Sequence, residues 1–504
     1  MVSPRKAVSG SGPKDKRSRL WSVIKWAVVS RMASLALGIV SNAVIDDYDA
    51  SLGVFLAAAP SGNSGHLSLL CSRLARGLAQ VVVRWDAFYF VHIADSGYVY
   101  EQEHAFFPLL PLLMRLLART VLAPLAALAG RQLALVVAGV AISNVSFVLA
   151  AGTIYRLGCA TLRSERLAYI AALLYTVAPS NMFMTAVYTE SLFAWLVFSA
   201  LLLISRRKYL LASLCLAASS LCRSNGVMYS GFIVWDLIVR SDARDGSTSS
   251  SGRRALLWQA LKATVLVAIS ALGFIAFQAF GKRELCQQPI HPPAASARPY
   301  CESSLSTVYG FVQAEYWDIG FLRYYTLQQL PNFLLAAPMV VLSGAGLWAY
   351  ATHDPLRVAT LGLRMRKRKL SAVQSVAAEE EADADADAEA DEEAEAEIQA
   401  TAAYFSDSLL PHMYFWAVLL GVAAATMHMQ VITRFFSSVP AVFWFAAHVV
   451  AASLPPPVSG QRTMATTTAK AALKTPAVAL AAVGYFAAYG LAGVVLFSNF
   501  FPPA

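Results

Sequence analysis

The fold is decided by the stretch Leu133–Tyr155, which reads LALVVAGVAISNVSFVLAAGTIY and contains no charged residue. A bilayer core of about 30 Å is crossed by roughly 20 apolar residues in a helix. Only helices and closed barrels satisfy their backbone hydrogen bonds in hydrocarbon, and so long an apolar run favours a helix. The stretch therefore predicts a membrane-spanning helix.

Similar apolar runs occur along the whole chain of 504 residues, which is 57% hydrophobic and 14% charged. Soluble domains usually carry about 25% charged residues, so this composition is typical of a membrane protein. We predict an all-α polytopic membrane protein with about eleven transmembrane helices. These lie near residues 22–44, 133–155, 168–184, 190–205, 209–223, 226–240, 255–280, 331–350, 408–426, 438–454 and 477–497.

The charge balance reports orientation rather than nucleic-acid binding. The formal net charge is +9, from 40 Lys+Arg and 31 Asp+Glu, but twelve of the acids lie between Glu379 and Glu397. The bases gather in short clusters between apolar runs, as the positive-inside rule describes. No nucleic-acid partner is expected. The block 370–402 alternates Ala with acids and is predicted to be a disordered cytosolic insert, although Asp383 and Asp385 match the Asp-x-Asp pattern of metal-dependent sugar transferases.

The basic residues of segment 1–20 place the N-terminus in the cytosol, and no signal-peptide cleavage site follows the first apolar run. Basic clusters at 156–166, 206–208, 240–254 and 364–369 fit the even-numbered loops on the same side. The luminal segments are then 45–132, 185–189, 281–330 and 427–437, and the C-terminus lies on the luminal side. The two long loops, 45–132 and 281–330, are where function is expected.

The first long loop contains an acid among aromatic residues, Trp85-Asp86-Ala87-Phe88-Tyr89. Apolar segments with spaced Arg at 67–83 and 108–119 predict interfacial helices beside it. Partial loss of water makes a carboxylate a better general base, so Asp86 is a candidate. Alternatively, the aromatics form an interfacial belt and Asp86 caps a helix. A metal site of nearby His and Glu is also conceivable, but their spacing matches no ligand motif, and we predict none.

Other polar residues lie at helix ends on the same predicted face. They are Asp47, Glu190, Arg223, Asn225, Gln430 and Arg434. Charges at membrane depth are costly, so Glu190, Arg223 and Arg434 are expected to pair with another charge or to face a polar cavity. An Arg here could bind the phosphate of a lipid-linked substrate. In the second loop, Cys286 and Cys301 either form a disulfide, worth roughly 3 kcal/mol, or remain two thiols.

Several of these stretches resemble the GPI mannosyltransferase 2 family. The first is Trp85-Asp86-Ala87-x-Tyr89-Phe90-x-x-Ile93-Ala94-x-x-Gly97-Tyr98, followed by Glu103-x-Ala105-Phe106-Phe107-Pro108-x-x-Pro111. Further matches are Ala186-x-Tyr188-Thr189-Glu190-Ser191-Leu192-Phe193, Arg223-Ser224-Asn225-Gly226, Tyr316-Trp317-Asp318-x-Gly320-Phe321-Leu322-Arg323-Tyr324-Tyr325, Gln329-x-Pro331-Asn332-Phe333-Leu334-Leu335-Ala336-Ala337-Pro338 and His428-x-Gln430-Val431-x-Thr433-Arg434-Phe435. Where the family has Asn-x-x-Ile-Pro-Asp-His, this chain has Asn42-Ala43-Val44-Ile45-Asp46-Asp47-Tyr48, without the Pro and His.

The resemblance implies a GT-C type mannosyltransferase of the endoplasmic reticulum membrane that acts on the luminal side. It would transfer the second mannose, α-1,6 linked, from dolichyl phosphate mannose to the GPI-anchor precursor. We expect Asp86 and Trp85 at the catalytic centre, with no obligatory cofactor. Tyr89, Asp47, Glu190, Arg223, Asn225, Tyr316, Trp317, Gln430 and Arg434 are expected to bind substrate. Fungal members of the family are associated with a small accessory membrane subunit, so such a partner is possible here.

Three other functions remain open at this stage. A transporter of lipid-linked sugars should show internal repeats, and none is evident in the sequence. A non-catalytic subunit of a transferase complex would not require acids and Arg to converge on one face. A dolichol-dependent transferase that adds a different mannose is the nearest competitor.

Overall fold

The computed structural model describes residues 13–49, 51, 53, 66–240, 250–287, 298–303, 305–363, 403–453 and 476–502, and its regular elements within these ranges are all helical. The first half contains α1 (Pro13–Val44), α3 (His66–Val82), α4 (Ala87–Ser96), η1 (Glu101–Ala105), α5 (Leu109–Arg119), α6 (Ala123–Ala129), α7 (Arg131–Leu162), α8 (Glu165–Thr176), α9 (Glu190–Ser205), α10 (Tyr209–Cys222), η2 (Ser224–Ser230), α11 (Gly231–Val234) and η3 (Trp235–Val239). The second half contains α13 (Ser250–Gln287), α14 (Pro299–Glu302), α15 (Val308–Trp317), η4 (Leu327–Gln329), α16 (Leu330–His353), α17 (Pro355–Ala359), η5 (Asp407–Leu409), α20 (Leu410–Thr426), η6 (Met429–Val431), α21 (Ile432–Phe436), α22 (Pro440–Ser453) and α24 (Pro476–Ser498).

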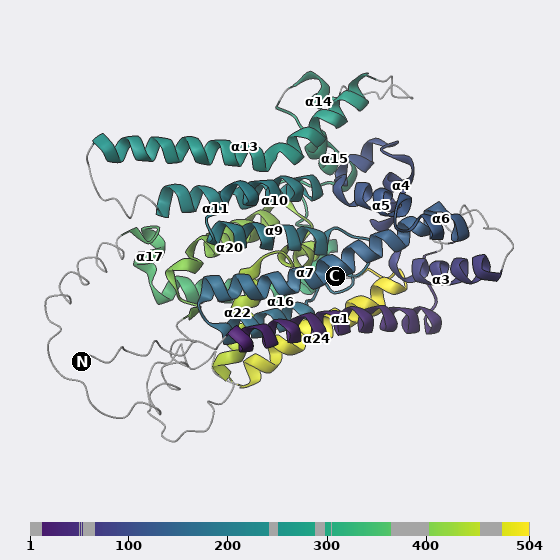
Figure 1. Ribbon diagram of the computed structural model, residues 1–504, viewed down its shortest axis with the longest axis horizontal. Helices are drawn as coiled ribbons and strands as arrows, with labels where there is room; N and C mark the ends of the chain where they lie inside the picture. Colours follow the sequence, from purple (N-terminus) through teal and green to yellow (C-terminus); the bar gives the residue numbers. More distant parts are fainter. Residues whose placement is uncertain are drawn as a thin grey trace.

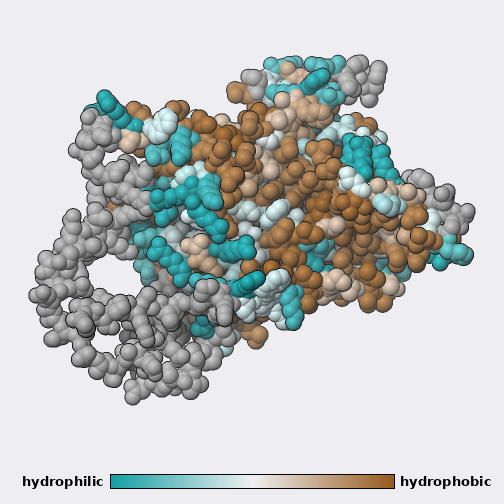
Figure 2. All heavy atoms as spheres, viewed as in Figure 1, coloured by the Kyte–Doolittle hydropathy of each residue, from teal (hydrophilic) through white to brown (hydrophobic). Residues whose placement is uncertain are grey.

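The long helices run side by side, and the short helices α4, α5, α14 and α15 gather toward one end of the bundle (Figure 1). In the described residues, α7 packs against α9, α8, α5 and α1, so it lies at the centre. Figure 2 shows a broad apolar surface over the middle of the molecule, with hydrophilic side chains gathered toward its ends. This distribution suits a helical bundle immersed in a bilayer, and the expected all-α polytopic class is confirmed.

Fewer helices than expected are long enough to cross the membrane. Six described helices have the necessary length and apolarity, namely Lys16–Val44, Arg131–Leu162, Arg253–Gln287, Leu327–His353, Asp407–Thr426 and Pro476–Ser498. Two bent pairs also qualify if each pair is one span. Leu109–Arg119 meets Ala123–Ala129 at 81°, and Met429–Phe436 meets Pro440–Ser453 at 84°. The described chain therefore has six to eight candidate spans rather than about eleven.

The difference arises between residues 165 and 240. The expected span 168–184 is divided, because α8 ends at Thr176 and buried turns follow up to Thr189. Helices α9 and α10 have the expected bounds, within a residue, but hold only 16 and 14 residues. The expected span 226–240 is a succession of 3-10, α and π turns. Helix α9 and the turns at 177–189 are largely buried against other helices, so most of their apolar side chains pack against protein, whereas Leu210, Leu211 and Leu214 of α10 are more than 50% exposed.

The buried turns at 177–189 are held by a cation from α1. Arg31, which is 3% exposed, donates to the carbonyl oxygen of Asn181 at 3.0 Å and to the hydroxyl of Thr185 at 2.6 Å. Irregular backbone at membrane depth persists only where protein or trapped polar groups satisfy it. The Arg31 contacts therefore fix the segment that leads into Tyr188 and Glu190.

The two long predicted luminal loops pack on each other. The expected helices at 67–83 and 108–119 are present as α3 and α5. Glu101 of the first loop accepts a hydrogen bond from the hydroxyl of Tyr316 at 2.8 Å and lies 2.7 Å from Nη2 of Arg298, both in the second loop. Cys286 and Cys301 form a disulfide in the same region, with Cα atoms 5.7 Å apart.

Some predictions fall outside the described residues. They concern the predicted acidic insert with Asp383 and Asp385.

Candidate active site

Four charged residues from distant parts of the chain form one ion-paired cluster. Arg434 of α21 lies 3.2 Å from Oδ2 of Asp86 through Nη1, and donates from Nε to Oε1 of Glu190 at 2.7 Å. Nη1 of Arg223 lies 2.9 Å from the same Glu190 oxygen. The two acids and two bases give the cluster a formal net charge of zero, which lowers the cost of burying its charged groups. The expected convergence of Asp86, Glu190, Arg223 and Arg434 is thus present in the structure.

Aromatic rings enclose the two guanidinium groups. That of Arg434 lies 4.4 Å from the ring centroid of Phe183 and 5.0 Å from that of Tyr188. That of Arg223 lies 4.9 Å from the ring of Phe435. Cation–π contacts hold an Arg in place without adding a further neutralising charge.

Asp86 is the most accessible acid of this cluster. Its side chain is 32% exposed, whereas that of Glu190 is fully buried. Asp86 occupies the position before α4, but its carboxylate makes no capping hydrogen bond there. Its backbone N–H donates to the hydroxyl of Tyr188 at 3.1 Å, and this hydroxyl donates to the carbonyl of Arg84 at 3.0 Å. The carboxylate is therefore available to a substrate, and the capping alternative lacks its defining bond.

Trp85 adopts a left-handed backbone conformation, with φ of 52°, and its side chain is 41% exposed. A bulky residue at positive φ is unfavourable and is maintained only where the surroundings hold it. The exposed indole lies beside Asp86 and can stack on a sugar ring.

Asp47, which was expected to bind substrate, pairs with a buried arginine. It lies 2.8 Å from Nη2 of Arg84 and accepts a hydrogen bond from Asn42 at 2.9 Å. Arg84 is fully buried, and burial lowers its pKa while Asp47 opposes that shift. Among the contacts of the described residues, Asp47 therefore neutralises Arg84 rather than joining the Asp86 cluster.

Tyr89 and Trp317 bring the two loops together next to Asp86. The Tyr89 ring stacks on Phe106 with centroids 4.4 Å apart, and meets the Trp317 ring at 6.4 Å. Burial raises the pKa of Tyr89, and the Asp86 and Glu103 carboxylates raise it further, so its hydroxyl stays protonated. Such a group can donate a hydrogen bond to a sugar.

The other expected site residues lie around this centre. Tyr316 pairs with Glu101, and Gln430 accepts from the hydroxyl of Tyr324 at 3.0 Å. Asn225 is 8% exposed, and neither of its amide atoms has a hydrogen-bond partner among the described residues. Of these, Asn225 is the one with unused buried hydrogen-bonding capacity, next but one to Arg223.

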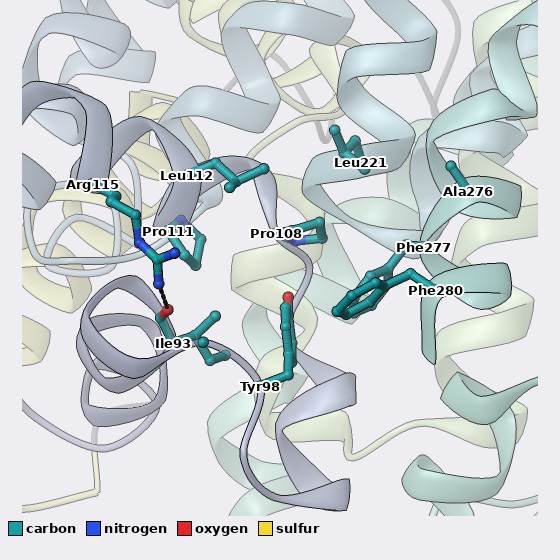
Figure 3. Close-up of a pocket in the computed structure, with 11 residues that line it drawn as sticks. Ile93, Tyr98, Pro108, Pro111, Leu112, Arg115, Leu221, Ala276, Phe277 and Phe280 are labelled. Carbon is teal, nitrogen blue, oxygen red and sulfur yellow. Dashed lines mark hydrogen bonds between the residues drawn. The ribbon is translucent and has the colours of Figure 1, made fainter. Parts of the chain in front are cut away.

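A pocket of about 330 Å³ opens between the first long loop and α13 (Figure 3). Its walls are mostly apolar and comprise Ile93, Gly97, Tyr98, Pro108, Pro111, Leu112, Arg115, Leu221, Ala276, Phe277 and Phe280. The Arg115 guanidinium points toward the backbone of α4, where it donates to the carbonyls of Ala94 and Ile93 at 2.7 and 3.0 Å. Leu221 precedes Arg223 by two residues, so the pocket adjoins the charged cluster.

The sequence pattern alone missed two contributors. Arg84 directly precedes the Trp85-Asp86 pair, and a basic residue next to that motif was a usable signal. The segment Ser498–Phe500 had no such signal, because nothing in its composition relates it to the first loop. In the described ranges no group of three or more His, Cys, Asp or Glu side chains could hold a metal ion. His92 pairs there with Glu103, and His104 lies buried among aromatic rings.

Comparison with known proteins gives the family. The model of the mannosyltransferase (PIG-V) family matches residues 20–504. The chain belongs to this family. GPI alpha-1,6-mannosyltransferase 2 of Mus musculus is 33% identical over 85% of this chain and 83% of its own. GPI mannosyltransferase 2 of Gibberella zeae is 30% identical over 83% of this chain and 86% of its own.

Among solved structures, the archaeal oligosaccharyltransferase AglB from Archaeoglobus fulgidus overlaps with a TM-score of 0.46 and 12% identity. The overlap covers 95% of this chain and 56% of AglB, and it is too loose for residue-by-residue equivalence. Membership of the PIG-V family makes this chain a glycosyltransferase that transfers mannose.

Proposed function

We propose that this protein transfers an α-1,6-linked mannose from dolichyl phosphate mannose to the one-mannose GPI-anchor precursor, on the luminal side of the endoplasmic reticulum membrane. The names of its relatives support GPI-anchor assembly in that membrane. The observation that carries the mechanism is the cluster of Asp86, Arg434, Glu190 and Arg223, in which an accessible acid stands beside two enclosed cations.

The transfer is a single inverting displacement. Asp86 takes the proton of the acceptor's 6-hydroxyl as this oxygen attacks the anomeric carbon of the donor mannose. The bond between that carbon and the phosphate oxygen breaks, and its electron pair leaves with dolichyl phosphate. A β-linked donor thereby gives an α-linked product. Because phosphate is a good leaving group, one base and one cation suffice, and no metal is required by the chemistry.

The two Arg residues have different parts in this scheme. In an inverting displacement, the base and the group that neutralises the leaving phosphate stand on opposite sides of the anomeric carbon. Arg434 contacts Asp86 directly and therefore orients the base. Arg223 is joined to Asp86 only through Glu190 and Arg434, so it is the better placed to neutralise the phosphate. Asn225 could add a hydrogen bond from its unused amide.

The pocket beside Arg223 suits the donor's hydrocarbon chain. Leu221 lies on one wall of the pocket, two residues before Arg223, and the other walls come from α4 and the loop after it, from α5 and from α13. Leu112 and Phe280 are 51% and 42% exposed, which gives the pocket an apolar rim. A lipid whose phosphate meets Arg223 can therefore place its first prenyl units among these side chains.

The disulfide supports the luminal assignment. Disulfides persist in the oxidising lumen and are rare in the cytosol. Cys286 and Cys301 form one in the second long loop, and this loop contacts the first through Glu101 with Arg298 and Tyr316. Both loops, and Asp86 with them, would therefore face the lumen.

Complementation tests the activity. The gene is expressed in cells that lack the second GPI mannosyltransferase, and lipids are analysed by mass spectrometry. We expect the one-mannose intermediate to disappear and surface GPI-anchored proteins to return. If the intermediate persists while a later one is consumed, the protein adds a different mannose. A small accessory subunit, if required, would have to be co-expressed.

Cysteine labelling in sealed microsomes tests the orientation. Leu305→Cys, at a site 92% exposed, is expected to react with a membrane-impermeant maleimide only after permeabilisation. Lys208→Cys, exposed in a basic loop predicted to be cytosolic, is the matched control and should react in intact vesicles. Labelling of the Leu305→Cys variant in intact vesicles, above the level of the unsubstituted protein, would refute the luminal assignment.

A further inference from the structure

We propose that the segment Ser498–Phe500, which begins at the last residue of α24, is a positioning element for the Trp85-Asp86 turn. The segment is far from this turn in sequence, and no motif connects the two. The inference rests on the proposed role of Asp86 as the base, and adds Phe500 and Arg84 as residues that act through it.

Arg84 is the first link between the segment and the turn. Its Nη2 donates to the carbonyl of Ser498 at 2.8 Å, and the same nitrogen lies 2.8 Å from Oδ1 of Asp47. Its guanidinium carbon lies 4.3 Å from the ring centroid of Phe500. The Arg84 side chain is fully buried. Because Arg84 immediately precedes Trp85, these contacts fix the residue from which the turn begins.

Phe500 is the second link, and it contacts both sides of Asp86. Its ring lies 6.0 Å from that of Trp85 and stacks with that of Phe88 at 6.1 Å. Phe500 is 3% exposed. Trp85 and Phe500 both have positive φ, 52° and 63°, which non-glycine residues adopt only when their surroundings enforce it. Each unfavourable backbone conformation is therefore held by packing against the other.

The segment is itself anchored to the end of α1. The backbone N–H of Tyr48 donates to the carbonyl of Asn499 at 2.9 Å, and Asn42 donates to that of Ser498 at 3.1 Å. The Asn499 side chain donates to the hydroxyl of Ser41 at 2.7 Å. Ser498 and Asn499 are fully buried. Because these contacts hold the segment against the end of α1, the segment can keep the Trp85-Asp86 turn in place rather than move with it.

The consequence for catalysis is geometric. Asp86 keeps Arg434 as a partner with or without Phe500, so its charge is unaffected. What the segment sets is the direction in which the carboxylate points, and a base misplaced by about 1 Å can cost 100-fold in rate. Loss of Phe500 should therefore lower kcat and leave KM for both lipids nearly unchanged.

The test compares Phe500→Ala and Phe500→Leu with Phe501→Ala in the full-length protein. Phe501 is the matched control, because it lies next to Phe500 but its ring packs against that of Tyr48 rather than against the turn. With dolichyl phosphate mannose and the one-mannose acceptor, we expect kcat to fall about 100-fold for Ala and less for Leu, with KM within about twofold. The Phe501→Ala variant should resemble the wild type. An unchanged kcat for Phe500→Ala overturns the inference.

Two further readouts separate positioning from general stability. In a double-mutant cycle, Phe500→Ala is combined with Trp85→Ala. Because both substitutions disturb the same turn, the double variant should lose little more kcat than the single variants. A loss of kcat equal to the product of the two single losses would contradict the inference. Hydrogen exchange does not depend on activity. Phe500→Ala should accelerate amide exchange in residues 84–90, and Phe501→Ala should not. If exchange there is unchanged the inference fails even where transfer is observed, whereas a wild-type protein without mannosyl transfer contradicts the proposed function instead.

Discussion

Removal of the Glu190 charge tests how the site is held together. Oε1 of Glu190 accepts from Nε of Arg434 at 2.7 Å and lies 2.9 Å from Nη1 of Arg223, while Oε2 has no partner among the described residues. Glu190→Gln keeps the size of the side chain and removes its charge. Arg434 would then have Asp86 as its remaining acidic partner, and Arg223 would have none among these contacts.

The size of the effect follows from burial. The side chains of Arg223 and Arg434 are 14% and 17% exposed, and that of Glu190 is fully buried. Removing one partner of a buried ion pair costs about 3–5 kcal/mol, because a charge is left uncompensated. Arg434 retains Asp86, so we take the lower figure, about 3 kcal/mol. If this loss falls on the active arrangement, the rate of transfer drops roughly 100-fold.

The assay is mannosyl transfer in microsomes, normalised to the amount of protein. Asp95→Asn is the matched control, because Asp95 pairs with Arg131 at 3.1 Å in a pair whose side chains are 34% and 51% exposed. Exposed pairs contribute about 0–1 kcal/mol, so this variant should retain nearly full activity. Wild-type transfer by Glu190→Gln at normal protein level would refute the view that Glu190 organises the two cations.

Three other perturbations have defined outcomes. Cys286→Ser should lower the midpoint of thermal unfolding, because it removes a disulfide worth about 3 kcal/mol. Cys71→Ser, at a free thiol, is the control. Mass spectrometry of non-reduced peptides that finds Cys286 and Cys301 as thiols would contradict the disulfide. Gly226→Ala should destabilise the protein by about 1–3 kcal/mol, because its Cβ would lie 2.6 Å from the backbone of Ser219, whereas Gly231→Ala meets no atom within 4 Å and should be tolerated in the same thermal assay. A metal chelator should leave transfer nearly unchanged; strong inhibition reversed by Mn²⁺ would instead indicate a metal at the acids of the first long loop.

The helices themselves could largely be predicted from apolar runs, but their relation to the membrane could not. Residues 190–205 were expected to be helical and form α9. Residues 168–184 are as apolar as a span, yet the chain turns after Thr176. An apolar run can be buried against other helices or exposed to lipid, and its sequence does not show which of the two surrounds it. The partner that stabilises these turns is Arg31, which lies some 150 residues away.

For the site, the cost of placing charge at membrane depth predicted that Glu190, Arg223 and Arg434 would pair or line a cavity. Their actual partners depend on contacts across 244 and 348 residues of sequence, which no local pattern encodes. Asp47 illustrates the limit. It was expected near the substrate as an acid of the first loop, but the buried Arg84 is its nearest charge, and that pairing depends on Ser498 from the far end of the chain.

The substitution Asp86→Asn tests whether Asp86 is the general base of the transfer. Asn fills the same space beside Arg434 but accepts no proton under these conditions, and positioned general bases contribute about 10²–10⁴-fold. We predict that microsomes containing this variant at wild-type protein level transfer mannose to the one-mannose precursor at less than about one hundredth of the wild-type rate. Full mannosyl transfer at normal protein level would show that Asp86 is not the base.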